Sequence, residues 1–165
     1  MLQRSIGIME SKKGFTEIIL YRPEHHEVFK QLNMEWLRSY NLVEDHDLMV
    51  LDDPQGIILD AGGMIFLAMH NGAIIGSAAL MKTGEKEFEL AKMAVSPEYR
   101  GQGISKMLLE KCIGHARSAG AEKISLFSNH NLTTAIALYE KYGFKHIPVK
   151  DSPFKTADVR MELIL

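Results

Sequence analysis

The sequence predicts an α/β fold with a mixed sheet, and three observations lead to this prediction. Two apolar runs, residues 64–70 and 73–81, are joined by Asn71-Gly72, a dipeptide typical of a tight β-hairpin. Residues 87–95 form a further strand-like segment, so an antiparallel meander of three strands is expected. The rest of the chain then alternates strand, helix, strand, helix and strand. Because a strand–helix–strand unit needs a crossover, its two strands are expected to pair in parallel.

Three further segments precede the hairpin. Residues 15–21 alternate in hydropathy and predict a first strand. Residues 23–40 carry apolar and aromatic side chains at three- and four-residue steps, which predicts a helix with Pro23 in its first turn. Residues 41–56 are acidic and irregular, with a short helix expected around residues 48–51.

Two helices and three strands are expected after the meander. Gly120 and Gly143 follow the two helical patterns, at the position where glycine commonly ends a helix. The expected elements are a helix over residues 104–119, a strand over 123–127, a helix over 133–142, and strands over 144–149 and 159–165.

Length and charge narrow the class of protein. The 165 residues suit one domain spanning residues 1–165. A net charge of −2 offers no basic excess for nucleic acid. The single cysteine, Cys112, excludes an internal disulfide and fits a reducing compartment. With no membrane-length apolar run and no signal-peptide pattern, we expect a cytoplasmic protein without membrane contact.

The strongest functional signal lies where the strand ending at Val95 leads into a helix. The turn Ser96-Pro97 is followed by a loop, residues 100–103, that contains two glycines and opens directly into the helix. Glycines let backbone amides approach a ligand, and a helix N-terminus adds unpaired N–H groups and a positive dipole. Arg100 adds a positive charge. This arrangement predicts a phosphate site, whereas a loop that merely connects strand to helix is the simpler alternative.

Two common phosphate motifs are excluded by single positions. A dinucleotide fingerprint would need a third glycine where this chain has Lys106. A P-loop would need Gly-Lys-Ser/Thr, which the loop lacks. A nucleotide- or flavin-binding domain is therefore disfavoured.

The motif Arg100-x-x-Gly103-x-Ser105 resembles the pyrophosphate loop of the GNAT superfamily of acyl-CoA-dependent N-acetyltransferases, which usually has Gly or Ala at the last position. Residues 135–144 resemble the second signature of that family, and one helix and one strand separate the two motifs. Together the similarity covers residues 87–149. It implies a mostly antiparallel sheet whose central parallel pair splays apart, flanking helices, and acetyl-CoA as co-substrate.

The resemblance also implies roles for individual residues. Tyr139 corresponds to the tyrosine that protonates the departing thiolate, although a packing role on its helix is the alternative. Glu89, on the strand before the loop, is the candidate base or water-holder, the alternative being a carboxylate paired with Lys92 or with another neighbour at the start of the strand. An asparagine of the second signature would fall at Leu132, so Asn129 or Asn131 beside it is the candidate cofactor contact. The resemblance implies that the cofactor is bound by the preceding strand at Met93, Ala94 and Val95 and by the loop at Arg100, Gly101, Gln102, Gly103, Ile104 and Ser105. Asn131 is included as the asparagine contact.

Three further features of the sequence give weaker functional signals. The run His25-His26-Glu27 does not predict a metal site, because adjacent side chains on a helix point in different directions. The acidic residues 44–47 and 52–53 form either an acidic wall for a cationic amine or a solvated loop. Trp36 is expected in the core or in a pocket wall.

The leading functional hypothesis is acetyl transfer from acetyl-CoA to an amine of a small molecule or peptide, directly within a ternary complex. A catalytically silent acyl-CoA-binding sensor or scaffold is the alternative. Homodimers are common among relatives, so a homodimer is possible here, but no feature of the sequence demonstrates one. The sequence leaves open the acceptor, the acyl-chain preference and the general base.

Overall fold

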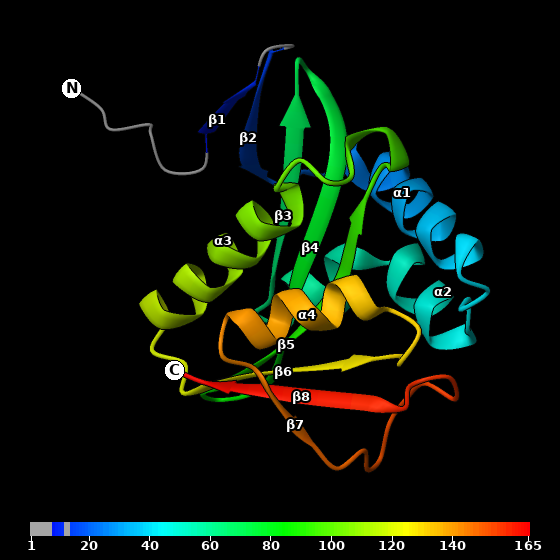
Figure 1. Ribbon diagram of the computed structural model, residues 1–165, viewed down its shortest axis with the longest axis vertical. Coiled ribbons are helices and arrows are strands. Elements are labelled where there is room, and N and C mark those ends of the chain that lie inside the picture. Colours follow the sequence, from blue (N-terminus) through cyan, green and yellow to red (C-terminus); the bar gives the residue numbers. More distant parts are fainter. Residues whose placement is uncertain (1–7, 12–13) are drawn as a thin grey trace.

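The computed structural model describes residues 8–11 and 14–165. Within these ranges, eight strands form one sheet in the order β1-β2-β3-β4-β5-β6-β8-β7 (Figure 1). The strands are β1 Ile8–Ser11, β2 Gly14–Leu20, β3 Met64–His70, β4 Ala73–Gly84, β5 Glu87–Val95, β6 Lys123–Ser128, β7 Lys145–Ile147 and β8 Val159–Ile164.

Strands β3, β4 and β5 form the expected antiparallel meander. Strands β2 and β1 extend it, each pairing antiparallel with its neighbour. The β3–β4 turn has positive φ at both central residues, 49° at Asn71 and 84° at Gly72. This conformation matches the right-handed twist of a hairpin, and it explains why Asn-Gly predicted the turn correctly.

The parallel pair lies in the middle of the sheet. β5 and β6 pair from Glu87↔Lys123 to Leu90↔Leu126, and the pairing then stops although β5 continues to Val95. The two strands therefore separate beyond Leu90, as the family resemblance implied. The backbone of β5 from Ala91 onward has no partner strand on this side among the described residues.

Helices cover both faces of the sheet (Figure 1). Along β3, Ile65 and Leu67 face a cluster that includes buried residues of α1 (His26–Ser39) and α2 (Asp45–Asp52). Phe66 and Ala68 face the opposite cluster, which includes buried residues of α3 (Ile104–Ser118) and Tyr139 of α4 (Thr133–Lys141). The alternation of side chains along a strand thus produces two apolar layers. A π-helical turn, Gln55–Leu59, and two 3-10 turns, Pro23–His25 and Pro97–Tyr99, complete the elements.

Some expectations need correction. Strand β1 was not predicted, α2 is longer than residues 48–51, and β7 is shorter than residues 144–149. The second strand–helix–strand unit does not give a parallel pair, because β8 lies between β6 and β7 and pairs antiparallel with both. A short C-terminal strand can enter between two earlier strands in this way without a crossover, which local pattern alone does not reveal.

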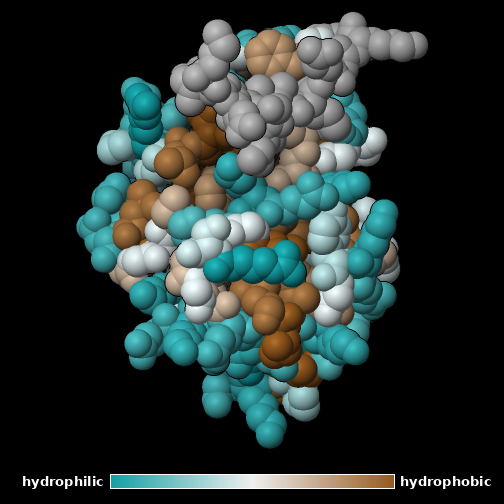
Figure 2. Space-filling view, turned by 90° about the vertical axis from the view of Figure 1, so that its left-hand side faces the viewer, coloured by the Kyte–Doolittle hydropathy of each residue, from teal (hydrophilic) through white to brown (hydrophobic). Residues whose placement is uncertain are grey.

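Large hydrophobic side chains are also exposed on the surface. On the side turned to the viewer in Figure 2, hydrophobic residues gather in a band between hydrophilic flanks. Phe15 and Leu20 of β2 are 49% and 54% exposed, and Ile164 of β8 is 67% exposed. A homodimer stays a prediction. In the described part of the chain, no helix has both the length and the hydropathy required to cross a membrane.

Candidate active site

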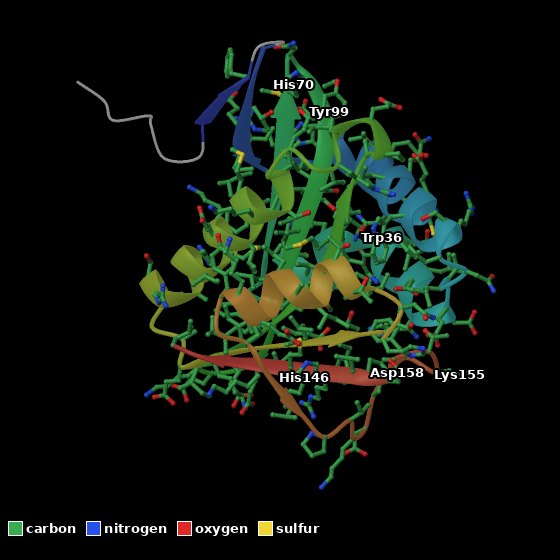
Figure 3. All side chains as sticks on the ribbon, in the orientation of Figure 1. Trp36, His70, Tyr99, His146, Lys155 and Asp158 are labelled. Carbon is green, nitrogen blue, oxygen red and sulfur yellow. The ribbon has the colours of Figure 1, made fainter. Side chains whose placement is uncertain are left out.

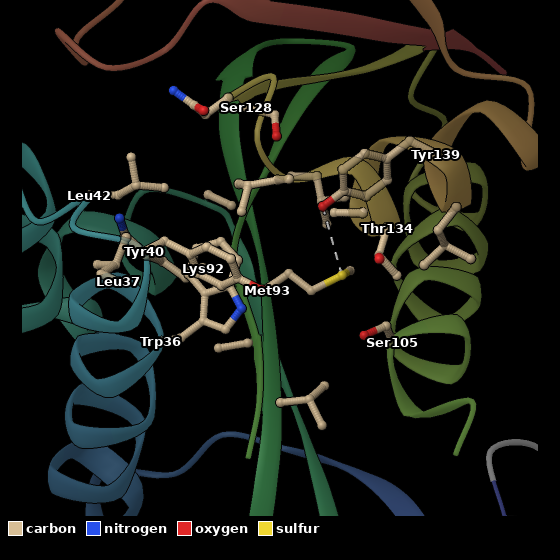
Figure 4. A pocket seen from close by; sticks show the side chains of 18 of the residues that line it. Trp36, Leu37, Tyr40, Leu42, Lys92, Met93, Ser105, Ser128, Thr134 and Tyr139 are labelled. Atoms are coloured by element: carbon tan, nitrogen blue, oxygen red, sulfur yellow. Dashed lines mark hydrogen bonds between the residues drawn. The ribbon is translucent and has the colours of Figure 1, made fainter. Parts of the chain in front are cut away.

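A cavity of about 590 Å³ opens where β5 and β6 separate. Its walls come from α1, the C-terminal half of β5, the loop before α3, the end of β6 and α4. Figure 4 shows Trp36 and Tyr40 on one side, Tyr139 and Ser105 on the other, and Met93 reaching between them. Segments distant in sequence therefore meet around one space.

Residues 100–105, here called the anion loop, form one end of the cavity. Gly101 and Gly103 have φ of 75° and 78°, a left-handed conformation that favours glycine. Gly103 is also the N-cap of α3, so the N-terminus of that helix opens at the cavity. The Arg100 Nε donates a hydrogen bond of 3.2 Å to the Val95 carbonyl, which holds the guanidinium beside the end of β5. These features suit a pyrophosphate.

Most predicted cofactor-binding residues line this cavity, and one does not. Gln102 is absent from the lining, and its side-chain amide donates instead to the Glu98 carbonyl at 3.3 Å. Asn129 and Asn131 both line the cavity. Asn129 is already engaged, since it donates to the Thr156 carbonyl at 2.7 Å and accepts from the Asn131 amide at 3.0 Å.

A β-bulge in β5 forms the middle of the cavity. Ser77 pairs with Ala94 and Ala79 with Ala91, so Lys92 and Met93 together oppose a single residue of β4. Lys92 has a φ of 51°, which is unusual for a residue with a Cβ. The bulge interrupts the ladder at the point where β6 has already departed, so this backbone is available to a ligand.

Tyr139 lies against the bulge. Its hydroxyl donates to the Met93 Sδ at 3.9 Å (Figure 4), and its ring packs 5.7 Å from the ring of Phe144. Burial, with a smaller contribution from Cys112, raises the pKa of Tyr139 to about 12. The phenol is therefore protonated at neutral pH, and its hydroxyl has only a weak sulfur acceptor. Both the packing role and the proton-donor role predicted from sequence remain compatible with this geometry.

Glu89 also lines the cavity and lies on β5, three residues before Lys92 of the bulge. Burial raises the pKa of its carboxyl group, while Lys92 and Arg160 act in the opposite direction. No hydrogen bond or ion pair holds this carboxylate among the residues that the structure describes. The alternative of a Glu89–Lys92 pair is wrong, because the Lys92 ammonium pairs with Asp47 instead. Both partners are buried, with side chains 5% and 3% exposed.

The opposite end of the cavity, here called the acceptor end, is rich in aromatic residues: Trp36, Tyr40, Phe127 and Phe154. The Trp36 and Tyr40 rings lie 5.1 Å apart. Trp36 is therefore a wall residue. Of the acidic run 44–47, Asp47 is buried and lines the cavity, which neither the acidic-wall nor the solvated-loop reading foresaw.

Glu44 fastens a second loop over the acceptor end. Its carboxylate accepts hydrogen bonds from the Lys155 amide at 2.6 Å, the Thr156 amide at 3.1 Å and the Thr156 hydroxyl at 2.5 Å. The His46 ring contacts the Phe154 ring edge-on at 4.9 Å. Figure 3 shows Lys155 in the loop that leads into β8. We call the hydrogen bonds of Glu44 to Lys155 and Thr156 the Glu44 clasp.

The two adjacent histidines near α1 have structural partners. His25 Nδ1 accepts from the Arg22 amide at 2.9 Å, and His26 Nε2 lies 2.9 Å from the Leu51 carbonyl. Among the described residues, no group of three or more His, Cys, Asp or Glu side chains is arranged to hold a metal ion.

The chain is similar in sequence to known acetyltransferases. A family model for the acetyltransferase (GNAT) family matches residues 27–144, more than half of the chain. N-acetyltransferase family 8 member 2 of Rattus norvegicus is 30% identical over 115 residues, which cover 67% of this chain and 51% of that protein. The uncharacterized N-acetyltransferase YjgM of Escherichia coli is 30% identical over 132 residues, covering 76% and 77% of the two chains. The chain spans about half the length of the rat relative.

Solved structures share the fold. An acetyltransferase of the GNAT family from Staphylococcus aureus superposes with a TM-score of 0.83 at 24% identity, over 90% of this chain and 98% of that one. The PaiA N-acetyltransferase of Thermoplasma acidophilum, solved with coenzyme A, gives 0.74 at 18% identity, over 91% and 99%. The chain belongs to the GNAT family of acetyltransferases, whose co-substrate is acetyl-CoA.

The residues present fit this co-substrate. A Cβ added at Gly101 would meet no atom within 4 Å, so the backbone of the anion loop is open to a ligand. The open edge of β5 beyond Leu90 can accept an extended pantetheine arm as a strand accepts a partner.

Proposed function

We propose that this protein transfers the acetyl group of acetyl-CoA directly to an amine of a small molecule or peptide, with both substrates bound together. The observation that carries the proposal is the single cavity that runs from the anion loop, past the bulge and Tyr139, to the aromatic acceptor end. Such continuity lets an amine reach a thioester without an intermediate carrier on the protein.

The anion loop would bind the pyrophosphate through the amides of residues 101–105 and the Arg100 guanidinium. The edge of β5 at residues 93–95 would bind the pantetheine arm. A backbone N–H at the bulge would donate to the thioester carbonyl, where negative charge develops during attack. Asn131, two residues before α4, also lines the cavity and is the proposed side-chain contact.

The reaction needs two proton movements. The neutral amine attacks the thioester carbon, a C–N bond forms, and the C–S bond breaks with the electron pair leaving on sulfur. The Tyr139 hydroxyl would give its proton to the thiolate in place of its weak contact with Met93. Glu89 would accept the amine proton directly or through water, and its raised pKa makes it a stronger base than an exposed carboxylate.

The charges lining the acceptor end favour a cationic acceptor. Among the charged residues that line this end, Asp47 and Lys92 neutralise one another, which leaves the Glu89 carboxylate. Arg160 lies outside the lining and favours the ionised form of Glu89. The aromatic rings of Trp36 and Tyr40, which also line this end, would bind an ammonium group or an apolar body. A primary amine with a hydrophobic substituent fits both features, whether it belongs to a small molecule or to a peptide.

The test is a panel of primary amines and peptides, assayed for thiol release from acetyl-CoA. Tyr139→Phe should lower kcat about 100-fold or more with little change in the Kd of CoA, because only the acid is removed. The matched control is Tyr142→Phe at the C-cap of the same helix, since that hydroxyl donates to Glu110 and the residue does not line the cavity. Equal effects in both variants would contradict the role of Tyr139.

The panel also separates the proposal from a silent acyl-CoA-binding module. Normal binding of CoA with no thiol release across the panel would overturn the proposal and favour the sensor or scaffold. Thiol release that depends on one class of amine would identify the acceptor.

A further inference from the structure

We infer that Ser77 and Asp47 are positioning residues, which aim the Met93 backbone N–H into the cavity toward the thioester carbonyl. The inference rests on the proposed function in one respect, namely that the bulge of β5 receives the thioester. It concerns how this chain holds the bulge, which the family fold does not determine.

The orientation follows from one hydrogen bond at the bulge. The Ser77 hydroxyl on β4 donates to the Lys92 carbonyl at 2.8 Å. No cis peptide bond occurs among the described residues, so the 92–93 peptide is trans and planar. In a trans peptide the carbonyl and the N–H point in opposite directions. Since the Lys92 carbonyl turns toward β4, the Met93 N–H turns away from it, toward the gap left by β6.

Ser77 is itself fixed from α1. The Asn33 side-chain amide donates to the Ser77 hydroxyl at 3.0 Å and to the Phe29 carbonyl, also at 3.0 Å. Asn33 is 2% exposed and Ser77 is fully buried. The hydroxyl therefore accepts one bond and donates the other, so its proton has a defined direction.

The side chain of Lys92 is held by a separate partner, Asp47 of α2. Its ammonium pairs with the Asp47 carboxylate in a site from which water is largely excluded, and it lies 5.4 Å from the centre of the Phe154 ring. The second oxygen of Asp47 accepts from the Glu44 amide at 2.9 Å, which fixes the carboxylate at the start of α2. Lys92 is thus restrained at its carbonyl and at its ammonium.

The restraint of Lys92 at both its carbonyl and its ammonium accounts for the unusual backbone of the bulge. A φ of 51° is unfavourable for lysine and persists only where the surroundings impose it. An apolar residue would pack as well in a bulge of purely structural purpose, because a buried ion pair contributes little net stability. What the pair and the Ser77 hydroxyl add is a defined orientation of one peptide group.

The experiment compares the Kd values of acetyl-CoA and CoA by calorimetry, in the wild-type protein and in two variants. Ser77→Ala removes the anchor of the Lys92 carbonyl. The double variant Asp47→Asn/Lys92→Met removes the ion pair without leaving a buried charge unpaired. Glu122→Gln is the control, because Glu122 forms an exposed surface pair with Lys86.

Acetyl-CoA carries an acetyl group in place of the thiol hydrogen of CoA, and the Met93 N–H would bind the carbonyl of that group. The wild type and the control should prefer acetyl-CoA, and this preference should fall about fivefold in each variant, the typical value of one net hydrogen bond. The Kd of CoA should change less than twofold. A structural role alone would weaken both ligands equally.

Three results would overturn the inference: no preference for acetyl-CoA in the wild type, a preference retained in Ser77→Ala, or parallel weakening of both ligands. If the double variant does not fold, Ser77→Ala decides the question, since it deletes one oxygen atom. A preference retained in Ser77→Ala would leave the proposed acetyl transfer intact, because that proposal is tested separately by thiol release.

Discussion

Replacing Glu89 by Gln removes the proposed base while keeping the shape of the side chain. Glu89 lines the cavity beside the bulge, and no described residue holds its carboxylate in an ion pair. Burial raises its pKa, which makes it a stronger base than an exposed carboxylate. Glu87→Gln is the matched control on the same strand, because Glu87 forms a surface pair with Lys123 at 3.2 Å and lies outside the cavity lining.

The size of the effect follows from the amine. A lysine-like amine with a pKa near 10.4 is neutral in about one molecule in ~2,500 at pH 7. With Glu89 in place, kcat should be nearly independent of pH until the carboxylate is protonated in acid. In Glu89→Gln, kcat should follow the neutral amine and rise about tenfold per pH unit toward ~10.4. At pH 7 the loss should be about 100-fold or more.

The assay is thiol release from acetyl-CoA at saturating amine, measured from pH 6 to pH 9 in the wild type and both variants. Thermal unfolding supplies a second readout. The folded-state pKa of Glu89 lies above its unfolded-state value. Ionisation of this carboxyl group therefore opposes folding as the pH rises from the unfolded-state pKa through the folded-state pKa. Glu89→Gln should therefore be at least as stable as the wild type at pH 7. A flat pH profile in Glu89→Gln, or a loss in Glu87→Gln of equal size, would refute the role of Glu89.

Three further outcomes are expected. Arg100→Ala should weaken CoA about tenfold, the size of one charge-assisted contact, but leave pantetheine unchanged; equal loss for both ligands would exclude a contact with phosphate. Burial alone would raise the pKa of Glu44, but the hydrogen bonds of its clasp to Lys155 and Thr156 lower it overall. The clasp should therefore hold above a pH of about 4.3 and open only in stronger acid. Hydrogen exchange at those two amides should accelerate about tenfold in Glu44→Ala and less in Glu44→Gln, whereas unchanged exchange in both would contradict the clasp. Complete burial raises the pKa of the Cys112 thiol, so a thiol reagent at pH 7.5 should modify the unfolded chain and not the native one; rapid native modification would contradict the packing of α3.

Much of the fold could be predicted because local signals agreed with tertiary structure. The Asn71-Gly72 turn requires positive φ, and the hairpin it predicted has β3 and β4 at the expected place. The helix that begins at Ile104 and ends before Gly120 is likewise an amphipathic segment with a glycine stop. The position of β8 between β6 and β7 could not be predicted, because strand order depends on packing between distant segments.

The candidate site could likewise be predicted only in part. The anion loop was found because its glycines and the helix start are consecutive in the sequence. The Lys92–Asp47 pair was missed, since the two residues lie 45 positions apart and Asp47 belongs to an acidic run typical of a surface loop. The positive φ of Lys92 has no sequence signal, because bulges depend on the partner strand. An apolar strand containing one lysine was the only available indication.

The most direct test of the account uses acetyl-CoA with an isotopically labelled acetyl group and the most active amine of the panel. Mass spectrometry then follows the label in the amine and in the intact protein. Direct transfer within one cavity predicts that the label appears on the amine nitrogen, in step with thiol release, while the mass of the protein stays unchanged. Label on the protein before it reaches the amine, or thiol release that yields labelled acetate alone, would contradict it.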